Sequence, residues 1–247
     1  MRYLLILALI ATACSYDQLE IHKFSQDISE LIQSNSPCIW QISKSYASID
    51  VQSGKVPNIS LALEQQCNEG YEITLIDAEH IETITISKTV LVQISGQNTT
   101  SGKRMIIGGG SENSGEGEYI IRTDSTSTGD IIVQNIEMRE WNGGLIRCDG
   151  GKSVTLRDSL FNGGGSIVHN TDGILNIQSD EFIGEWIHVP IDPFIFATKG
   201  SINIYNSLFK KGSFKGDRNG CIVCCGTVTQ CTIDECEFIE NKFNVGS

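Results

Sequence analysis

Basic side chains are scarce in this sequence of 247 residues. It has 18 lysines and arginines against 30 aspartates and glutamates, which gives a formal net charge of −12 at pH 7. A protein that binds nucleic acid needs concentrated Lys and Arg to neutralise phosphates. The shortage argues against a nucleic-acid partner and is typical of a solvated extracellular surface.

Long apolar runs are also lacking. The run Leu4–Ile10 is far shorter than the ~20 residues that cross a bilayer, and no later stretch approaches that length. It follows the basic Arg2 and precedes the small residues at 11–13, which is the arrangement of a secretory signal peptide over residues 1–13. We therefore expect a secreted or surface-displayed protein without a transmembrane span. Residues 14–57 receive no firm assignment from the sequence.

Cysteine, in contrast, is abundant, with nine residues. Behind a signal peptide this number indicates an oxidising compartment and some disulfides. If Cys14 is lost with the signal or otherwise occupied, the others can pair, in a connectivity that the sequence leaves open: Cys38, Cys67, Cys148, Cys221, Cys224, Cys225, Cys231 and Cys236. The spacing of the last five favours disulfides or a buried thiol stack over a zinc site. Sequons at Asn58 and Asn98 are candidate glycosylation sites.

A repeated pattern dominates the second half of the chain. Its form is apolar-x-apolar-x-polar-small-x-Phe, with Met in the last position of the first copy, and the copies span residues 131–138, 154–161, 175–182, 202–209 and 231–238. A second short apolar element precedes each copy after the first, and a glycine separates the two elements, at positions 151, 173, 200 and 226. A short period with loops of variable length is typical of a solenoid.

The direction of the repeats predicts how the strands pair. Identical elements that recur in the same chain direction cannot close as hairpins, so they must pair in parallel with the repeats before and after. Alternation then points the apolar set inward, and Phe161, Phe182, Phe209 and Phe238 should stack in one internal column. Nothing resembling a cap follows Phe238. We expect the last repeat to fray, to be held by its cysteines, or to pair with another chain.

The region before the repeats carries a family resemblance. Residues 59–67 have helical apolar spacing and form a candidate cap. Residues 73–76, 82–88 and 90–96 follow as short strands, the second of the form E-x-I-x-I and the third ending in Gly. This order resembles the start of pectin-lyase-like β-helices, and the resemblance covers roughly residues 58–247. It implies an all-β fold, a right-handed parallel β-helix solenoid with a short amino-terminal helical cap. It implies little about activity, because the fold hosts lyases, hydrolases, esterases and adhesins.

The catalytic motifs of that family are largely missing. Asn170-Thr171-Asp172 matches the first element of a polygalacturonase-like site, but the acid pair, Gly-His-Gly and Arg-x-Lys that uronate hydrolysis needs are absent. Asp192 lies in a context similar to a pectinesterase nucleophile, with a Pro inserted after it. Asp172 and Asp192 are therefore weak catalytic candidates. No spacing is typical of metal ligands, and we expect neither a metal nor a cofactor.

A small basic ladder is the best candidate for a binding surface. When the second elements are aligned on their first apolar residues, Arg122, Arg147 and His169 share a column, and Ala197 and Cys224 follow in the same column. If these side chains point outward, the first three can meet an anionic sugar or a carboxylate. The alternative is a solvated face whose basic groups pair with neighbouring acids.

Trp186 and His188 lie in an enlarged turn, which is where solenoids place binding sites. Together these features predict a binding or structural protein that presents its turns and a sheet face to a carbohydrate, a surface glycoprotein or another copy of itself. The alternative is a polysaccharide-active enzyme with an unrecognised site. A third reading is a repeat fragment of a larger surface protein.

Overall fold

The structure is a computed structural model that describes residues 37–97, 103–107, 119–140, 144–163, 168–184, 193–215 and 220–244. The chain divides into two units, Met1–Pro37 and Cys38–Ser247, and the elements described below belong to the second. Several predicted features lie outside the described residues: the signal peptide at 1–13, the sequon at Asn98, and Asp192, Trp186 and His188.

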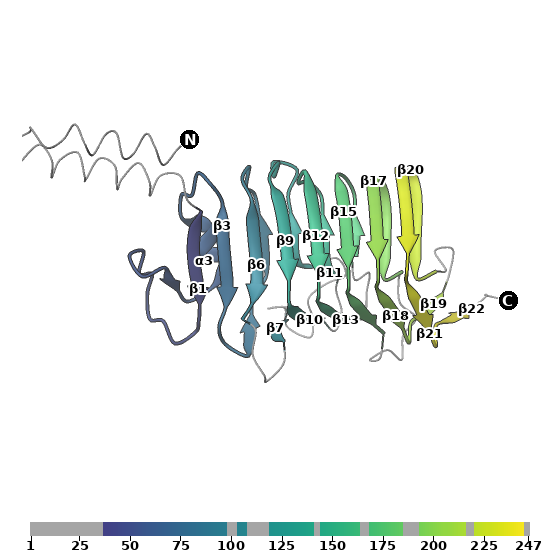
Figure 1. Ribbon diagram of the computed structural model, residues 1–247, viewed down its shortest axis with the longest axis horizontal. Helices are drawn as coiled ribbons and strands as arrows, with labels where there is room; N and C mark the ends of the chain where they lie inside the picture. Colours follow the sequence, from purple (N-terminus) through teal and green to yellow (C-terminus); the bar gives the residue numbers. More distant parts are fainter. Residues whose placement is uncertain are drawn as a thin grey trace, which may run out of the picture. The chain divides into compact units, whose positions relative to one another are not determined.

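Row one is the longest series of parallel strands. Figure 1 shows its members side by side from β1 to β20. They are β1 (Cys38–Ile42), β3 (Tyr71–Leu75), β6 (Val92–Gly96), β9 (Asp130–Gln134), β12 (Ser153–Arg157), β15 (Ile174–Gln178), and the second halves of β17 (Ile195–Tyr205) and β20 (Ile222–Asp234). A short strand, β2 (Lys55–Val56), pairs with the outer edge of β1.

Two further rows of parallel strands accompany row one. Row two contains β4 (Glu79–Ile81), β7 (Arg104–Ile107), β10 (Ile136–Glu140), β13 (Leu160–Gly163), β16 (Glu181–Ile183), β18 (Leu208–Lys210) and β21 (Glu237–Ile239). Row three contains β5 (Ile84–Ile86), β8 (Tyr119–Thr123), β11 (Gly144–Cys148), β14 (Val168–Asn170), and the first residues of β17 and β20. A last pair joins β19 (Ser213–Lys215) to β22 (Lys242–Asn244).

The chain visits the three rows in turn, and each neighbour within a row comes from the adjacent repeat. Strand β17 illustrates the order, because Ile195 pairs with Val168 of row three while Ile202 pairs with Leu175 of row one. The prediction of an all-β chain with parallel pairing between repeats is confirmed.

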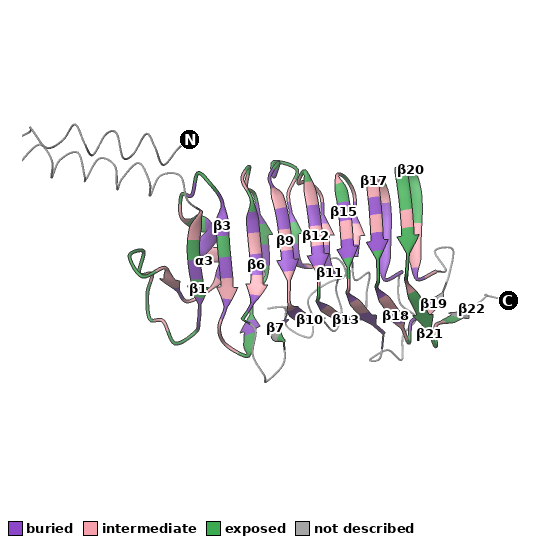
Figure 2. Cartoon of the chain, in the orientation of Figure 1, coloured by how far each residue is buried: buried purple, intermediate pink, exposed green. Residues whose placement is uncertain are grey.

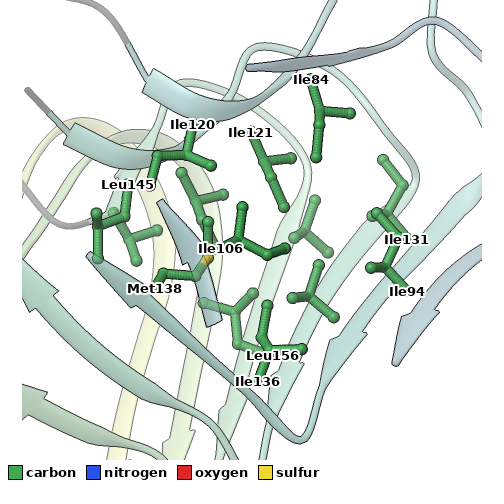
Figure 3. Packing of buried hydrophobic residues seen from close by; sticks show 14 of the residues in the cluster. Ile84, Ile94, Ile106, Ile120, Ile121, Ile131, Ile136, Met138, Leu145 and Leu156 are labelled. Atoms are coloured by element: carbon green, nitrogen blue, oxygen red, sulfur yellow. The ribbon is translucent and has the colours of Figure 1, made fainter. Parts of the chain in front are cut away.

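The core lies between the rows. Along row one from β1 to β17, buried residues alternate with partly or fully exposed ones (Figure 2), and apolar side chains fill the interior (Figure 3). The residues predicted to point inward are all buried: Ile131, Val133, Val154, Leu156, Leu175, Ile177, Ile202 and Ile204. Alternation of side chains along a strand explains why every second residue belongs to this set.

The phenylalanine column is present in row two. Phe161 and Phe182 stack at 5.0 Å between ring centroids, and Phe182 and Phe209 at 4.8 Å. Phe238 continues the stack at 5.1 Å from Phe209, but it is 49% exposed. The predicted internal column is therefore correct for three rings and wrong for Phe238, because β21 ends row two and only one side of its ring is covered.

The turn between rows one and two contains a residue in the left-handed backbone conformation. One residue at this turn has positive φ in five successive repeats: Asn135, Asp158, Ser179, Asn206 and Glu235, with φ between 47° and 56°. Asn and Asp tolerate this conformation better than other residues with a side chain. The turn from row three to row one uses glycine instead, as at Gly173 and Gly200, with φ of 77° and 76°.

The amino-terminal helix α3 (Ile59–Glu64) is shorter than the predicted cap. The Asn58 side chain caps it by accepting a hydrogen bond from the Leu61 N–H at 2.8 Å. The Glu82 carboxylate accepts from the N–H groups of Ile59 and Ser60, where the helix dipole favours negative charge. The sheet itself already begins at Cys38, inside the region 14–57 that the sequence left unassigned.

Candidate functional site: the outward face of row three

Strand pairing in row three places the predicted basic column in register. Arg122 of β8 pairs with Arg147 of β11, which pairs with His169 of β14. The next members of the column are Phe196 and Val223. We call Arg122, Arg147, His169 and Phe196, with the adjacent Tyr119 and Asp149, the row-three face.

The predicted continuation of this column through Ala197 and Cys224 is wrong. Ala197 pairs with Asn170, and both are three residues before a turn glycine, Gly200 and Gly173 respectively. Counting back from these glycines would have given the observed register. Aligning on the first apolar residue shifted it by one position, which exchanges the two faces of a strand.

Asp149 holds both arginines of the face. Its carboxylate accepts hydrogen bonds from Nε of Arg147 at 2.8 Å and from Nε of Arg122 at 2.9 Å. The Thr171 hydroxyl donates a third, at 2.9 Å. The Arg122 side chain is 54% exposed, whereas that of Asp149 is 13% exposed. The carboxylate thus fixes two guanidinium groups and neutralises only one of their charges.

The same contacts determine how Asp149 ionises. Burial by itself would raise its pKa, but the hydrogen bonds from Arg147 and Thr171 and the charges of Arg147 and Arg122 outweigh burial, so the pKa is lowered from 3.8. The carboxylate therefore stays ionised and the arginines stay anchored at neutral pH.

Aromatic groups border the arginines. The guanidinium carbon of Arg147 lies 5.8 Å from the ring centroid of Tyr119, within cation–π range. The Tyr119 hydroxyl lies 3.3 Å from Nδ1 of His169, and the His169 and Phe196 rings are 5.0 Å apart. Phe196 itself is buried, with 6% of its surface exposed. The face combines positive charge, hydrogen-bond donors and rings in one strip across four repeats.

Asp172, the described catalytic candidate, does not join this face. It is exposed, and its carboxylate accepts a hydrogen bond from the N–H of Gly173 at 2.8 Å. This contact makes it a turn residue, as expected for an Asp before a glycine with positive φ. Within the described residues, no group of three or more His, Cys, Asp or Glu side chains is arranged to hold a metal ion.

The cysteines divide into two groups. Cys38 and Cys67 form a disulfide with a Cα–Cα distance of 5.8 Å. The other candidates carry free thiols in the structure: Cys148, Cys221, Cys224, Cys225, Cys231 and Cys236. Burial raises the pKa of the Cys148 thiol to about 12 and that of Cys221 to about 11. Cys148 is no disulfide partner here because its in-register neighbours are Thr123 and Asn170.

Sequence reasoning missed the buried Asp180. It precedes the Phe182 position and is 2% exposed, in the place that Ser159 and Ser207 occupy in the adjacent repeats. A signal was present, because Asp stands where the neighbouring copies have Ser.

Comparison of the chain with protein-family models, with curated proteins and with solved structures gives no match. Among the residues that the structure describes, no helix is long and apolar enough to span a membrane. The geometry above is therefore the basis for any functional assignment.

Proposed function

We propose that this chain is a secreted or surface-displayed right-handed parallel β-helix of the pectin-lyase-like type, with a binding role directed at acidic carbohydrate or glycoprotein. The fold proposal is supported by three rows of parallel strands in which each repeat supplies one strand per row. The buried side-chain columns between the rows also support it.

One observation carries the binding proposal: among the described residues, two in-register arginines share the single carboxylate of Asp149, which can balance only one of their two positive charges. Guanidinium groups recognise carboxylates and other planar anions through paired N–H donors. A protein with a net charge of −12 would otherwise repel an acidic polymer. Tyr119 supplies a ring beside the charged groups, which suits the apolar face of a sugar.

A glycan array screened with the secreted protein tests this proposal. We expect uronate- or sulfate-bearing glycans to bind, and the binding to weaken as salt rises. Arg122→Ala should weaken it roughly three- to tenfold, since a half-exposed charged contact is worth about 1 kcal/mol. Arg157→Ala is the matched control, because Arg157 is an outward arginine of row one. Equal effects of both substitutions, or binding confined to neutral glycans, would contradict the proposal.

A reducing-end assay on acidic polysaccharides separates binding from catalysis. A binding protein should release no new ends above the level of a heat-inactivated sample. Turnover that disappears in Asp172→Asn, with folding intact, would establish the enzyme alternative instead.

Self-association through the last repeat is a second candidate function. Ile233 and Phe238 are 46% and 49% exposed, although their in-register partners Ile204 and Phe209 are fully buried. An exposed apolar sheet end with unpaired backbone groups is a template for another chain. Sedimentation velocity across a concentration series should show a dimer that Phe238→Asp abolishes. A monomer at all concentrations would remove this candidate.

A further inference from the structure

The last repeat has cysteines at two inward positions. Cys231 is in register with Ile202, at the end of the row-one column that contains Ile131, Val154 and Leu175. Cys224 is in register with Ala197, at the end of a row-three column. Both cysteines therefore lie in a repeat that no further strand covers among the described residues.

The two thiols face each other across the turn at Gly226. The Sγ atoms of Cys224 and Cys231 are 2.9 Å apart, about 1 Å more than a disulfide bond of ~2.05 Å, and both residues are exposed to reagents. The neighbouring thiols are directed elsewhere: Cys225 Sγ lies 3.5 Å from the carbonyl oxygen of Ala197, and Cys236 Sγ lies 3.2 Å from that of Asp234.

We propose that Cys224 and Cys231 are a redox site, which forms an intramolecular disulfide that ties row three to row one at the open end of the sheets. The bond closes a short loop within β20 and fastens a repeat that, among the described residues, has a neighbouring strand on one side only. In the earlier repeats, apolar packing against the next strand holds the corresponding residues in place. In this repeat the disulfide would hold them instead. The proposal is independent of what binds to the row-three face.

The oxidant is a small-molecule disulfide, such as oxidised glutathione, and the reaction is thiol–disulfide exchange. The Cys231 thiolate attacks one sulfur of the small disulfide, whose S–S bond breaks and releases one small thiolate. Cys224 then loses its proton to solvent and attacks Cys231 Sγ, which forms the Cys224–Cys231 bond and releases the second small thiolate. Two protein thiols are oxidised and one small disulfide is reduced to two thiols. Partial burial and the neighbouring Cys231 thiol raise the pKa of the Cys224 thiol to about 12.

Differential alkylation of the full chain tests the proposal. The folded protein is equilibrated with excess oxidised glutathione and denatured with a first alkylating label, then reduced and treated with a second label. Mass spectrometry locates both labels. We expect the second label on Cys224 and Cys231 at least tenfold more than on Cys225 or Cys236. Excess dithiothreitol before the first label should reverse this pattern.

Two variants sharpen the result. Cys231→Ser should leave Cys224 with the first label, whereas the matched control Cys236→Ser should leave the pair oxidised. The Cys38–Cys67 disulfide serves as an internal standard. The positions of the two labels in the wild-type protein test the proposal even if a variant fails to fold. Four results would overturn it: free thiols at both positions while Cys38–Cys67 is intact, a bond from either cysteine to a different cysteine, a covalent dimer, or a glutathione adduct that persists on Cys231.

Discussion

Asp180 offers a quantitative test of how the rows pack. Its Oδ1 accepts a hydrogen bond from the Ser159 N–H at 2.7 Å, whereas Oδ2 is buried without a hydrogen-bond partner in the structure. Burial raises its pKa from 3.8 to about 8, and this effect outweighs the backbone hydrogen bonds from Ser159 and Gln178, which lower the pKa. The folded protein therefore holds this carboxyl in its protonated form at neutral pH.

The sign of the pH dependence follows from this shift. The folded pKa lies above the unfolded one, so the contribution to stability is complete below pH 3.8 and is lost as the pH rises toward 8. Each pKa unit corresponds to about 1.4 kcal/mol, so by pH 7 the loss reaches about 4 kcal/mol relative to acid conditions. Asp180→Asn cannot ionise and should not show this loss.

Urea unfolding of the oxidised protein between pH 4 and pH 8 measures the effect. We expect the free energy of unfolding of Asp180→Asn, relative to the wild type, to increase by several kcal/mol across this range. Taking the difference cancels the groups that both proteins share, such as Asp149, whose lowered pKa acts in the opposite direction. Asp172→Asn is the matched control, because it removes a carboxyl that is exposed rather than buried. A difference for Asp180→Asn that stays flat, or that is no larger than the difference for Asp172→Asn, would refute the reasoning.

Two further predictions concern packing. Phe182→Ala should lower the free energy of unfolding by about 3–5 kcal/mol, because it leaves a cavity in the core. Phe238→Ala should lower it by less than about 2 kcal/mol, because that ring is 49% exposed. Denaturant unfolding measures both, and equal losses would contradict the phenylalanine column. Gly200→Ala should destabilise by about 2 kcal/mol or more, because φ is +76° and a Cβ would lie 1.9 Å from the carbonyl oxygen of Gly173. Gly220→Ala, with its nearest contact at 3.5 Å, should change the melting temperature little, and a similar shift for both would count against the turn assignment.

The sequence by itself determined the all-β character, the parallel pairing and the core columns of row one. The physical reason is local: a period of two selects the buried face, and repeats that run in one direction leave parallel neighbours as the way to pair. The inward positions of Ile131, Leu156 and Ile177 and the stack around Phe182 follow from these rules alone. The basic column could be predicted as far as His169 for the same reason.

Only the tertiary structure decided the rest of the site. Phe196 instead of Ala197 completes the column, because loops of different length precede each row-three strand and a slip of one residue exchanges its faces. Asp149 anchors Arg122 across 27 residues of sequence, a contact that exists only once neighbouring repeats are stacked. Cys224 and Cys231, whose Sγ atoms are 2.9 Å apart, lie on either side of two register shifts between β17 and β20. Local patterns fix which residues are inside, whereas contacts between repeats depend on loop lengths and register, which composition and periodicity do not determine.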